Sequence, residues 1–282
     1  MLDKKNPFRV CILLPSKFPA IGGYENLVYL LVQSLSKKVE VHVVCTGLSS
    51  TIPIPKNVKV HAIPPVTNIR VIGFILNNLL NQFRVLRLAR KHKFDFFHAH
   101  PSFPPGLIAL LAKTLLKIPL VCTSHGADIQ VDPKVGYGSR NNKVISWLVK
   151  LVLKNTDLHT VVSKSMIEDA IDAGSTPSKL RVVYNGINLD SILRGYNSQS
   201  LKKYGIEAED FVILFLSRLH PKKCPEDLVK AFPKVVEKVP NAKLIFAGKG
   251  EEESKLKQLT TKLNLNNNIV SVSYTHLTLP TN

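Results

Sequence analysis

The feature that most constrains this chain is a repeated alternation of short apolar runs with longer amphipathic stretches. The runs FRVCILL, VEVHVVC, FDFFHAH, PLVCTSH and DLHTVV are rich in β-branched and aromatic residues, and segments with apolar residues at helical spacing separate most of them. Such runs predict strands that are buried in a parallel sheet. Strands that alternate with helices predict a doubly wound α/β fold.

The same alternation begins a second time after a polar connection. Residues 1–187 carry the first series, and residues 188–272 carry a shorter one that contains the runs FVILFL, AKLIFAG and NIVSV. We therefore expect two Rossmann-like domains with doubly wound parallel sheets, the second of them incomplete. Residues 273–282, SYTHLTLPTN, break the pattern and resemble translated sequencing-adapter sequence. We expect this tail to be non-native.

Two cations follow the first strand of the second series at close spacing. We expect residues 211–216 to be buried on both faces of their sheet, with Arg218 and Lys223 just beyond the end of that strand. Ligands of open α/β sheets bind outside the carboxyl ends of the strands, and the helix that we expect from Pro225 also favours an anion at its N-terminus. This chemistry fits a phosphate or a diphosphate. The alternative is a solvated loop that happens to carry two cations.

Glycines and histidines near other predicted strand ends are further candidates. Gly22 and Gly23 lie between a strand and a helix, where a backbone without Cβ atoms can approach a phosphate or can simply turn. His125 and His100 each end a predicted strand. Each is either a binding residue or a half-buried histidine whose hydrogen bonds the backbone satisfies.

Composition narrows the class of protein without selecting a partner. No apolar run approaches the roughly 18 residues that a membrane-spanning helix needs. The 4 cysteines have no metal-type spacing, which suits reduced thiols and predicts a cytoplasmic protein. The formal net charge of +18 attracts anionic substrates, nucleic acid or acidic lipid surfaces.

Residues 76–93 are the most specific candidate for contact with an acidic surface. Apolar residues such as Leu79 and Phe83 follow one side of this predicted helix, and Arg84 and Arg87 belong to a basic cluster on another. Such a helix is compatible with peripheral binding to an anionic membrane, at the inner face of the cell membrane. The alternative is a solvated charged face above an ordinary core contact.

Six short motifs, taken in order, resemble those of family-4 retaining glycosyltransferases, which have the GT-B fold. They are GGYEN, DFFHAHP, VCTSHGAD, VVYNGIN, SRLHPKK and FAGKGEE. Their common order is stronger support than any one of them. The resemblance implies an enzyme that moves a sugar from a nucleotide-diphosphate sugar to an acceptor hydroxyl with retention of configuration. Such an enzyme would act in glycoconjugate, cell-surface polysaccharide or glycolipid synthesis.

The resemblance also assigns roles to individual residues. It implies that Arg218 and Lys223 hold the diphosphate, where preorganised cations stabilise the charge of the departing group. It implies that His125 faces the donor sugar and that the acceptor side includes His100 and Asp128. Four glycines then lie near the donor or line the acceptor site: Gly22, Gly23, Gly248 and Gly250. No cofactor or metal is expected, and the chain has no Asp-x-Asp sequence to hold one.

One departure from the family pattern concerns the end of the chain. Family members carry a glutamate-rich motif that binds the donor sugar and ribose, and it is absent here. We therefore expect a truncated chain that is inactive or poorly folded by itself. Two other classes stay open: a nucleotide-sugar epimerase or phosphorylase on the same fold, and a basic protein that binds anions or nucleic acid without catalysis. The second lacks a recognition-helix pattern and aromatic-basic interleaving, so we expect no nucleic-acid partner.

Overall fold

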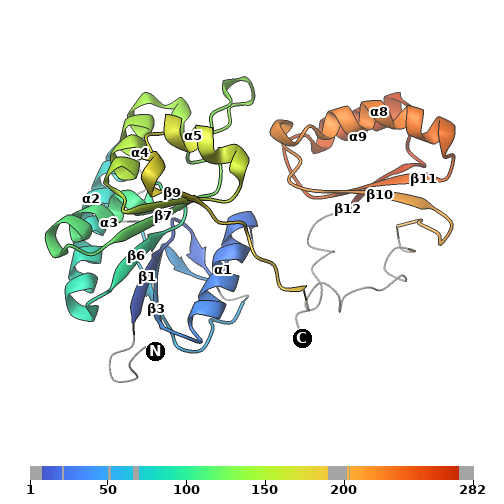
Figure 1. Ribbon diagram of the computed structural model, residues 1–282. Coiled ribbons are helices and arrows are strands. Elements are labelled where there is room, and N and C mark those ends of the chain that lie inside the picture. The colour runs from blue at the N-terminus through green and yellow to red at the C-terminus, as the bar shows by residue number, and fades with distance from the viewer. Residues whose placement is uncertain are drawn as a thin grey trace. The chain divides into compact units, whose positions relative to one another are not determined.

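The computed structural model describes residues 8–20, 22–49, 52–65, 70–189, 202 and 204–272 (Figure 1). The chain divides after Asn188 into two compact units. We call them the N-terminal unit and the C-terminal unit and describe each by itself.

The N-terminal unit is built on a seven-stranded sheet in the order β5-β3-β1-β6-β7-β8-β9. Every neighbouring pair in this sheet is parallel. A short parallel pair, β2 (Lys17–Phe18) and β4 (Gly47–Leu48), forms a separate two-stranded ladder. The strands of the large sheet are β1 (Arg9–Leu13), β3 (Glu40–Cys45), β5 (Val58–Ala62), β6 (Phe96–Ala99), β7 (Leu120–Ser124), β8 (Leu158–Val161) and β9 (Leu180–Val182).

Helices cover both faces of this sheet. Because successive residues of a strand point to opposite faces, Val10 and Ile12 of β1 pack in one cluster with α1, while Cys11 and Leu13 pack in another with the remaining helices. The helices are α1 (Gly23–Leu35) on the first face and α2 (Arg70–His92), α3 (Pro105–Leu116), α4 (Lys143–Asn155) and α5 (Ile167–Asp172) on the second. Short 3-10 turns cover Pro133–Val135, Ser139–Asn141, Lys164–Met166 and Pro177–Lys179. The expected doubly wound parallel sheet is confirmed in this unit.

The C-terminal unit contains a three-stranded parallel sheet in the order β10-β11-β12. Phe232 of α8 packs with Leu244 and Phe246 of β11 in its core, and Figure 1 shows α8 and α9 together on one face of the sheet. The elements are β10 (Phe211–Leu216), β11 (Ala242–Ala247), β12 (Ile269–Val272), α8 (Pro225–Lys238), α9 (Glu253–Lys262) and a 3-10 turn at Pro221–Lys223.

The expectation that residues 211–216 are buried on both faces is wrong. Val212, Leu214 and Leu216 are 37%, 56% and 58% exposed. Among the described residues β10 pairs only with β11, and the two helices cover only the face toward which Ile213 and Phe215 point. An apolar run reports the preference of the residues for burial, whereas the neighbouring strands and helices decide whether they are buried.

The environments of the cysteines agree with the sequence. Cys11, Cys45 and Cys122 are buried thiols inside strands, and Cys224 is exposed. Burial raises the pKa of Cys122 to about 12, so this thiol is inert at neutral pH. None of the described helices has the length and apolar character required to cross a membrane.

Candidate functional site

The loops that follow β1, β6 and β7 bring most of the N-terminal candidates to one edge of the sheet. His100 follows β6 and His125 follows β7, and their ring nitrogens Nδ1 and Nε2 lie 3.1 Å apart. Tyr24, in the first turn of α1, stacks on His125 with ring centroids 5.2 Å apart. The turn at Gly22 and Gly23, which leads directly into Tyr24, therefore lies near His125.

Asp128 connects the loops that carry these side chains through hydrogen bonds. Its side chain is buried at 3% exposure. One carboxylate oxygen accepts hydrogen bonds from the Ser102 backbone N–H at 3.0 Å, from the Ser124 hydroxyl at 2.8 Å and from the Ser102 hydroxyl. The other accepts from the backbone N–H of His125 at 3.3 Å. Asp128 thus joins the loops after β6 and β7, and its contact with an acceptor stays a prediction.

Both histidines of this edge are neutral at pH 7. Burial lowers the pKa of His125, although the carboxylate of Asp128 opposes that shift. Burial and the neighbouring His98 and His125 hold the pKa of His100 well below its ordinary value. The Nε2 atom of His100 is buried and has no hydrogen-bond partner among the described residues. A neutral imidazole offers one donor and one acceptor, so these rings can bind sugar hydroxyls without adding charge.

The two glycines before α1 differ in the space around them. A Cβ atom on Gly22 would lie 2.3 Å from the carboxylate of Glu25, whereas one on Gly23 would meet nothing within 4 Å. The backbone at Gly23 is therefore open to a ligand. Tyr24 beside it is a neutral hydrogen-bonding group at pH 7, and burial raises its pKa further, to about 12.

Sequence reasoning missed a pocket at the ends of β1, β3 and β5. It has a volume of about 200 Å³ and is mainly apolar, with the polar side chains of Asn77, Asn78 and Asn81 contributed by α2. The remaining lining residues are Leu13, Leu14, Pro15, Val44, Cys45, Thr46, Ile63, Pro65, Pro104, Pro105 and Ile108. No short motif connects these segments. The only signal in the sequence is three asparagines among the apolar residues in the first half of α2, where they are poor helix formers.

In the C-terminal unit, the loops after β10 and β11 pack directly against each other. Leu219 N–H donates to the carbonyl of Lys249 at 3.0 Å. A Cβ atom on Gly248 would lie 1.9 Å from the carbonyl oxygen of Ser217, and one on Gly250 would lie 2.1 Å from that of Leu219. This packing alone requires glycine at both positions. Contact of Gly248 and Gly250 with a nucleotide stays a prediction.

Arg218 and Lys223 flank the turn that precedes α8. Both side chains are exposed, and neither makes a hydrogen bond or ion pair with the described part of the chain. Lys223 ends the 3-10 turn, Cys224 follows in the left-handed conformation with φ 49°, and α8 then begins at Pro225. The two cations therefore lie close in sequence to the N-terminus of a helix, a position that favours anions.

The structure thus groups the predicted residues in two sets, one in each unit. The N-terminal set contains Gly22, Gly23, His100, His125 and Asp128. The C-terminal set contains Arg218, Lys223, Gly248 and Gly250. Both sets lie in loops that follow the carboxyl ends of parallel strands, where ligands of such sheets bind.

The sequence profile of Glycosyltransferase Family 4 matches residues 21–191, and the profile of Glycosyl transferases group 1 matches residues 197–278. This chain belongs to Glycosyltransferase Family 4. The family that the six motifs indicated is therefore confirmed.

Relatives and solved structures agree with this assignment. The chain is 27% identical over 260 residues to N-acetyl-alpha-D-glucosaminyl L-malate synthase of Bacillus anthracis, a match that covers 90% of this chain and 65% of the relative. It is 27% identical over 271 residues to alpha-monoglucosyldiacylglycerol synthase of Acholeplasma laidlawii, which covers 89% and 66%. The chain thus spans less than two thirds of the length of these relatives.

A solved structure shares the fold of this chain. The crystal structure of Anabaena HepE in complex with UDP and glucose superimposes with a TM-score of 0.72 at 19% identity, over 95% of this chain and 69% of HepE. The expected GT-B fold with Rossmann-like parallel sheets is confirmed.

Proposed function

We propose that the protein transfers a sugar from a nucleotide-diphosphate sugar to an acceptor hydroxyl with retention of anomeric configuration, in the synthesis of a glycoconjugate, glycolipid or cell-surface polysaccharide. The observation that carries the proposal is the pair of exposed cations, Arg218 and Lys223, before α8 in a chain of Glycosyltransferase Family 4. The binding of UDP and glucose by HepE supports a donor of this class.

The two cations would act on the leaving group. When the bond between sugar and diphosphate breaks, negative charge grows on the diphosphate oxygens, and fixed positive groups aimed at them lower the barrier. The guanidinium of Arg218 can bind two oxygens at once, and Lys223 supplies a compact charge. The N-terminus of α8 adds backbone N–H groups. The reaction therefore proceeds in this proposal without a metal ion.

The N-terminal set would hold the sugar and the approaching acceptor. The neutral His125 orients the donor sugar, and Asp128 positions His125 through the backbone N–H at 3.3 Å. The Nε2 atom of His100, which has no hydrogen-bond partner in the described part of the chain, gains one when a hydroxyl reaches it. The open backbone of Gly23 admits a phosphate or the acceptor. The pocket lined by the three asparagines of α2 is the proposed acceptor pocket.

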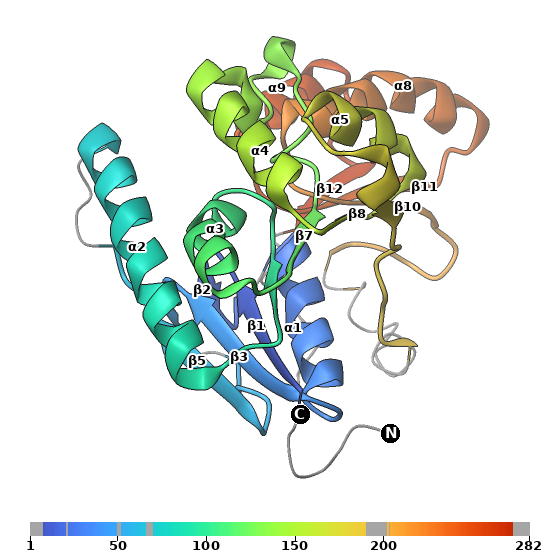
Figure 2. The same ribbon diagram turned by 60° about the vertical axis from the view of Figure 1, so that its left-hand side comes forward.

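A lipid-linked acceptor is the acceptor class that α2 favours. Ile75, Leu79 and Phe83 recur at every fourth residue and are 56%, 51% and 60% exposed, so the apolar side of α2 is not fully covered by the core. Figure 2 shows α2 along the outside of the N-terminal unit. Arg87 lies one turn beyond Phe83 and is exposed. An exposed apolar stripe next to arginines fits an anionic membrane surface.

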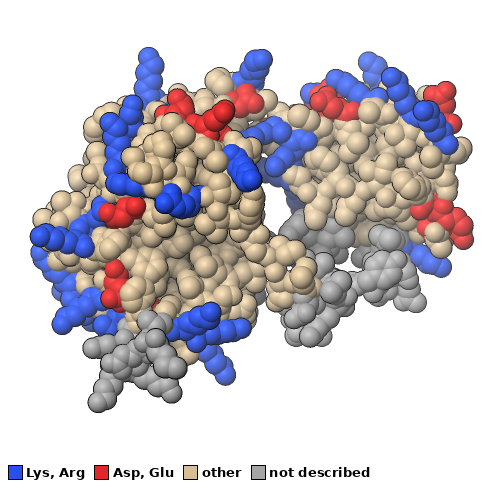
Figure 3. Space-filling model, viewed as in Figure 1, with Lys and Arg blue, Asp and Glu red and all other residues tan. Residues whose placement is uncertain are grey.

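Other observations also favour a lipid-linked acceptor over nucleic acid. Figure 3 shows Lys and Arg spread over the visible surface of both units, so the net charge of +18 has no single basic groove on that face. One relative is named as a synthase of monoglucosyldiacylglycerol, a glycolipid.

The donor site is tested by calorimetric titration with UDP. Arg218→Ala and Lys223→Ala should each weaken binding by about ten-fold or more, since a hydrogen bond to a charged group contributes about 1.5–3 kcal/mol. Lys234→Ala, in the second half of α8, removes the same charge and should leave the affinity unchanged. If Lys234→Ala weakens binding as much as Arg218→Ala, the effect is one of general charge and the proposed site is wrong.

The reaction is tested with UDP-sugars and a panel of lipid and polar acceptors. Transfer with retention gives a product with the donor's anomeric configuration, which NMR of the product detects. Release of free sugar or of an epimer without transfer would instead indicate a hydrolytic or epimerase activity on the same fold.

Membrane contact is tested by co-sedimentation with vesicles. We expect binding to anionic vesicles and little binding to neutral ones, and Leu79→Ser with Phe83→Ser should abolish it. Trp147→Ser, a change at an equally exposed apolar residue of α4, is the matched control. Equal binding to neutral and anionic vesicles would remove the membrane hypothesis.

A further inference from the structure

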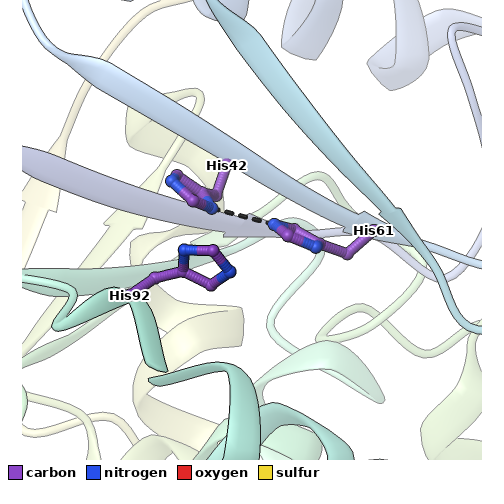
Figure 4. A group of neighbouring side chains, drawn as sticks. All are labelled: His42, His61 and His92. Atoms are coloured by element: carbon purple, nitrogen blue, oxygen red, sulfur yellow. Dashed lines mark hydrogen bonds between the residues drawn. The ribbon is translucent and has the colours of Figure 1, made fainter. Parts of the chain in front are cut away.

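Three histidines that the predicted site does not include meet on the N-terminal unit. His42 lies in β3, His61 lies in β5, and His92 is the last residue of α2 (Figure 4). One nitrogen from each ring belongs to a group of atoms that all lie within 4.8 Å of one another. We propose that this histidine cluster binds a divalent transition-metal ion, with Zn²⁺ as the expected ion.

The positions of the rings suit a three-histidine site. Nδ1 of His42 lies 2.8 Å from Nε2 of His61. The ring centroid of His92 lies 4.6 Å from the centroid of His42 and 5.2 Å from that of His61. In Figure 4 the rings of His42 and His61 face each other, and that of His92 lies against both. Zinc–nitrogen bonds of about 2.0–2.1 Å in a tetrahedral complex separate the ligand nitrogens by about 3.3 Å.

Only small movements are needed to admit the ion. The contact between His42 and His61 has to widen by about 0.5 Å to reach tetrahedral geometry. The ring of His92 has to turn inward, and its position at the end of α2 and its partial exposure permit this rotation. In the absence of metal, a hydrogen bond joins Nδ1 of His42 to Nε2 of His61, and the ion would replace its proton.

A carboxylate orients the buried ligand in the way that metal sites require. Nε2–H of His42 donates to Glu40 Oε1 at 3.0 Å, so the lone pair of Nδ1 faces the other two rings. Glu40 is itself fixed by Arg9 at 3.2 Å and by Lys59 at 2.5 Å. A carboxylate behind a ligating histidine fixes the tautomer and strengthens the ligand.

The ligand atoms decide which metals fit. Glu40 forms ion pairs with Arg9 and Lys59 beside the cluster, and Lys91 precedes His92. Mg²⁺ and Ca²⁺ prefer oxygen ligands, whereas Zn²⁺, Co²⁺ and Ni²⁺ bind imidazole nitrogen. A surface pocket lined by His61, Arg84 and Lys91 gives access from solvent.

The bound ion would fasten the end of α2 to β3 and β5. This role is separate from sugar transfer, so the inference does not depend on the proposed function. It also adds a constraint among segments that lie 19 residues apart and more in sequence.

The test is calorimetric titration of the EDTA-treated and dialysed 282-residue protein with ZnCl₂. We expect one Zn²⁺ per chain and, with Co²⁺, the intense visible absorption of a tetrahedral complex. His61→Gln and His92→Gln change partly exposed ligands on different elements, and each should weaken Zn²⁺ binding at least ten-fold. His220→Gln, in the C-terminal unit, is the matched control and should bind as the wild type does.

Two further measurements keep the result interpretable. Circular dichroism should show the same helix content in all four proteins, and Zn²⁺ should raise the thermal unfolding temperature of the wild type and His220→Gln only. The proposal is overturned if the wild type binds no Zn²⁺, or if folded His61→Gln and His92→Gln bind it as tightly as the wild type.

Discussion

Replacement of Asp128 by asparagine tests whether this buried carboxylate holds the edge of the sheet together. The carboxylate accepts four hydrogen bonds, from two donors of Ser102, one of Ser124 and the backbone N–H of His125. An asparagine whose carbonyl oxygen keeps the three donors on one side must turn its NH₂ group toward the N–H of His125. The charge-assisted bond from the N–H of His125 is then lost, and two donors, this N–H and the asparagine NH₂, point toward each other.

The size of the effect follows from these contacts. A hydrogen bond to a charged group contributes about 1.5–3 kcal/mol, and the three bonds that remain become weaker as bonds to a neutral acceptor. Asp128→Asn should therefore lower the free energy of unfolding of the N-terminal unit by about 3 kcal/mol. With a slope of about 2 kcal/mol per molar urea, the midpoint falls by about 1.5 M.

Urea unfolding followed by tryptophan fluorescence measures this loss, because the chain has 1 tryptophan, Trp147, and it lies in the N-terminal unit. Asp132→Asn is the matched control, since Asp132 lies in the same loop and accepts one hydrogen bond from Lys134 N–H at 3.2 Å. Asparagine caps such a turn about as well as aspartate, so the control should change stability by less than about 0.5 kcal/mol. Equal midpoints for the two variants would show that the buried network does not stabilise the unit.

Three further substitutions give distinct outcomes. Gly248→Ala should destabilise the C-terminal unit by about 1–3 kcal/mol, because its Cβ would lie 1.9 Å from the Ser217 carbonyl oxygen; faster hydrogen exchange in β10 and β11 would report it. Gly23→Ala, with nothing within 4 Å of the new Cβ, should leave thermal stability unchanged while weakening the binding of UDP or of an acceptor, and unchanged binding of both would argue against a ligand at this backbone. The pKa of His98 is lowered to about 4, mainly by burial. Between pH 6.5 and pH 4 His98 is therefore protonated in the unfolded chain but neutral in the folded chain, and the free energy of unfolding falls as the pH drops through this range. His98→Gln should remove up to about 3 kcal/mol of that fall. If the urea midpoint of the variant falls with pH as strongly as that of the wild type, His98 is not the cause of the pH dependence.

Much of the N-terminal unit is predictable from local pattern. The run of β1 predicts a strand buried on both faces, and Val10 through Leu13 are buried as expected. The order of the motifs is enough to indicate the family. Because ligands bind at the carboxyl ends of parallel strands, the placement of His100 and His125 beyond β6 and β7 follows from strand direction alone.

Tertiary structure decides which of these residues touch. Asp128 reaches Ser102, 26 positions earlier, only because β6 and β7 are neighbours in the sheet. His42, His61 and His92 have no metal-type spacing in the sequence, and the pairing of β3 with β5 and the end of α2 bring them together. The apolar pattern of residues 211–216 likewise could not predict that one face of β10 is exposed. Periodicity reports the direction in which a side chain points from its own element, whereas strand order and helix placement determine what it meets there.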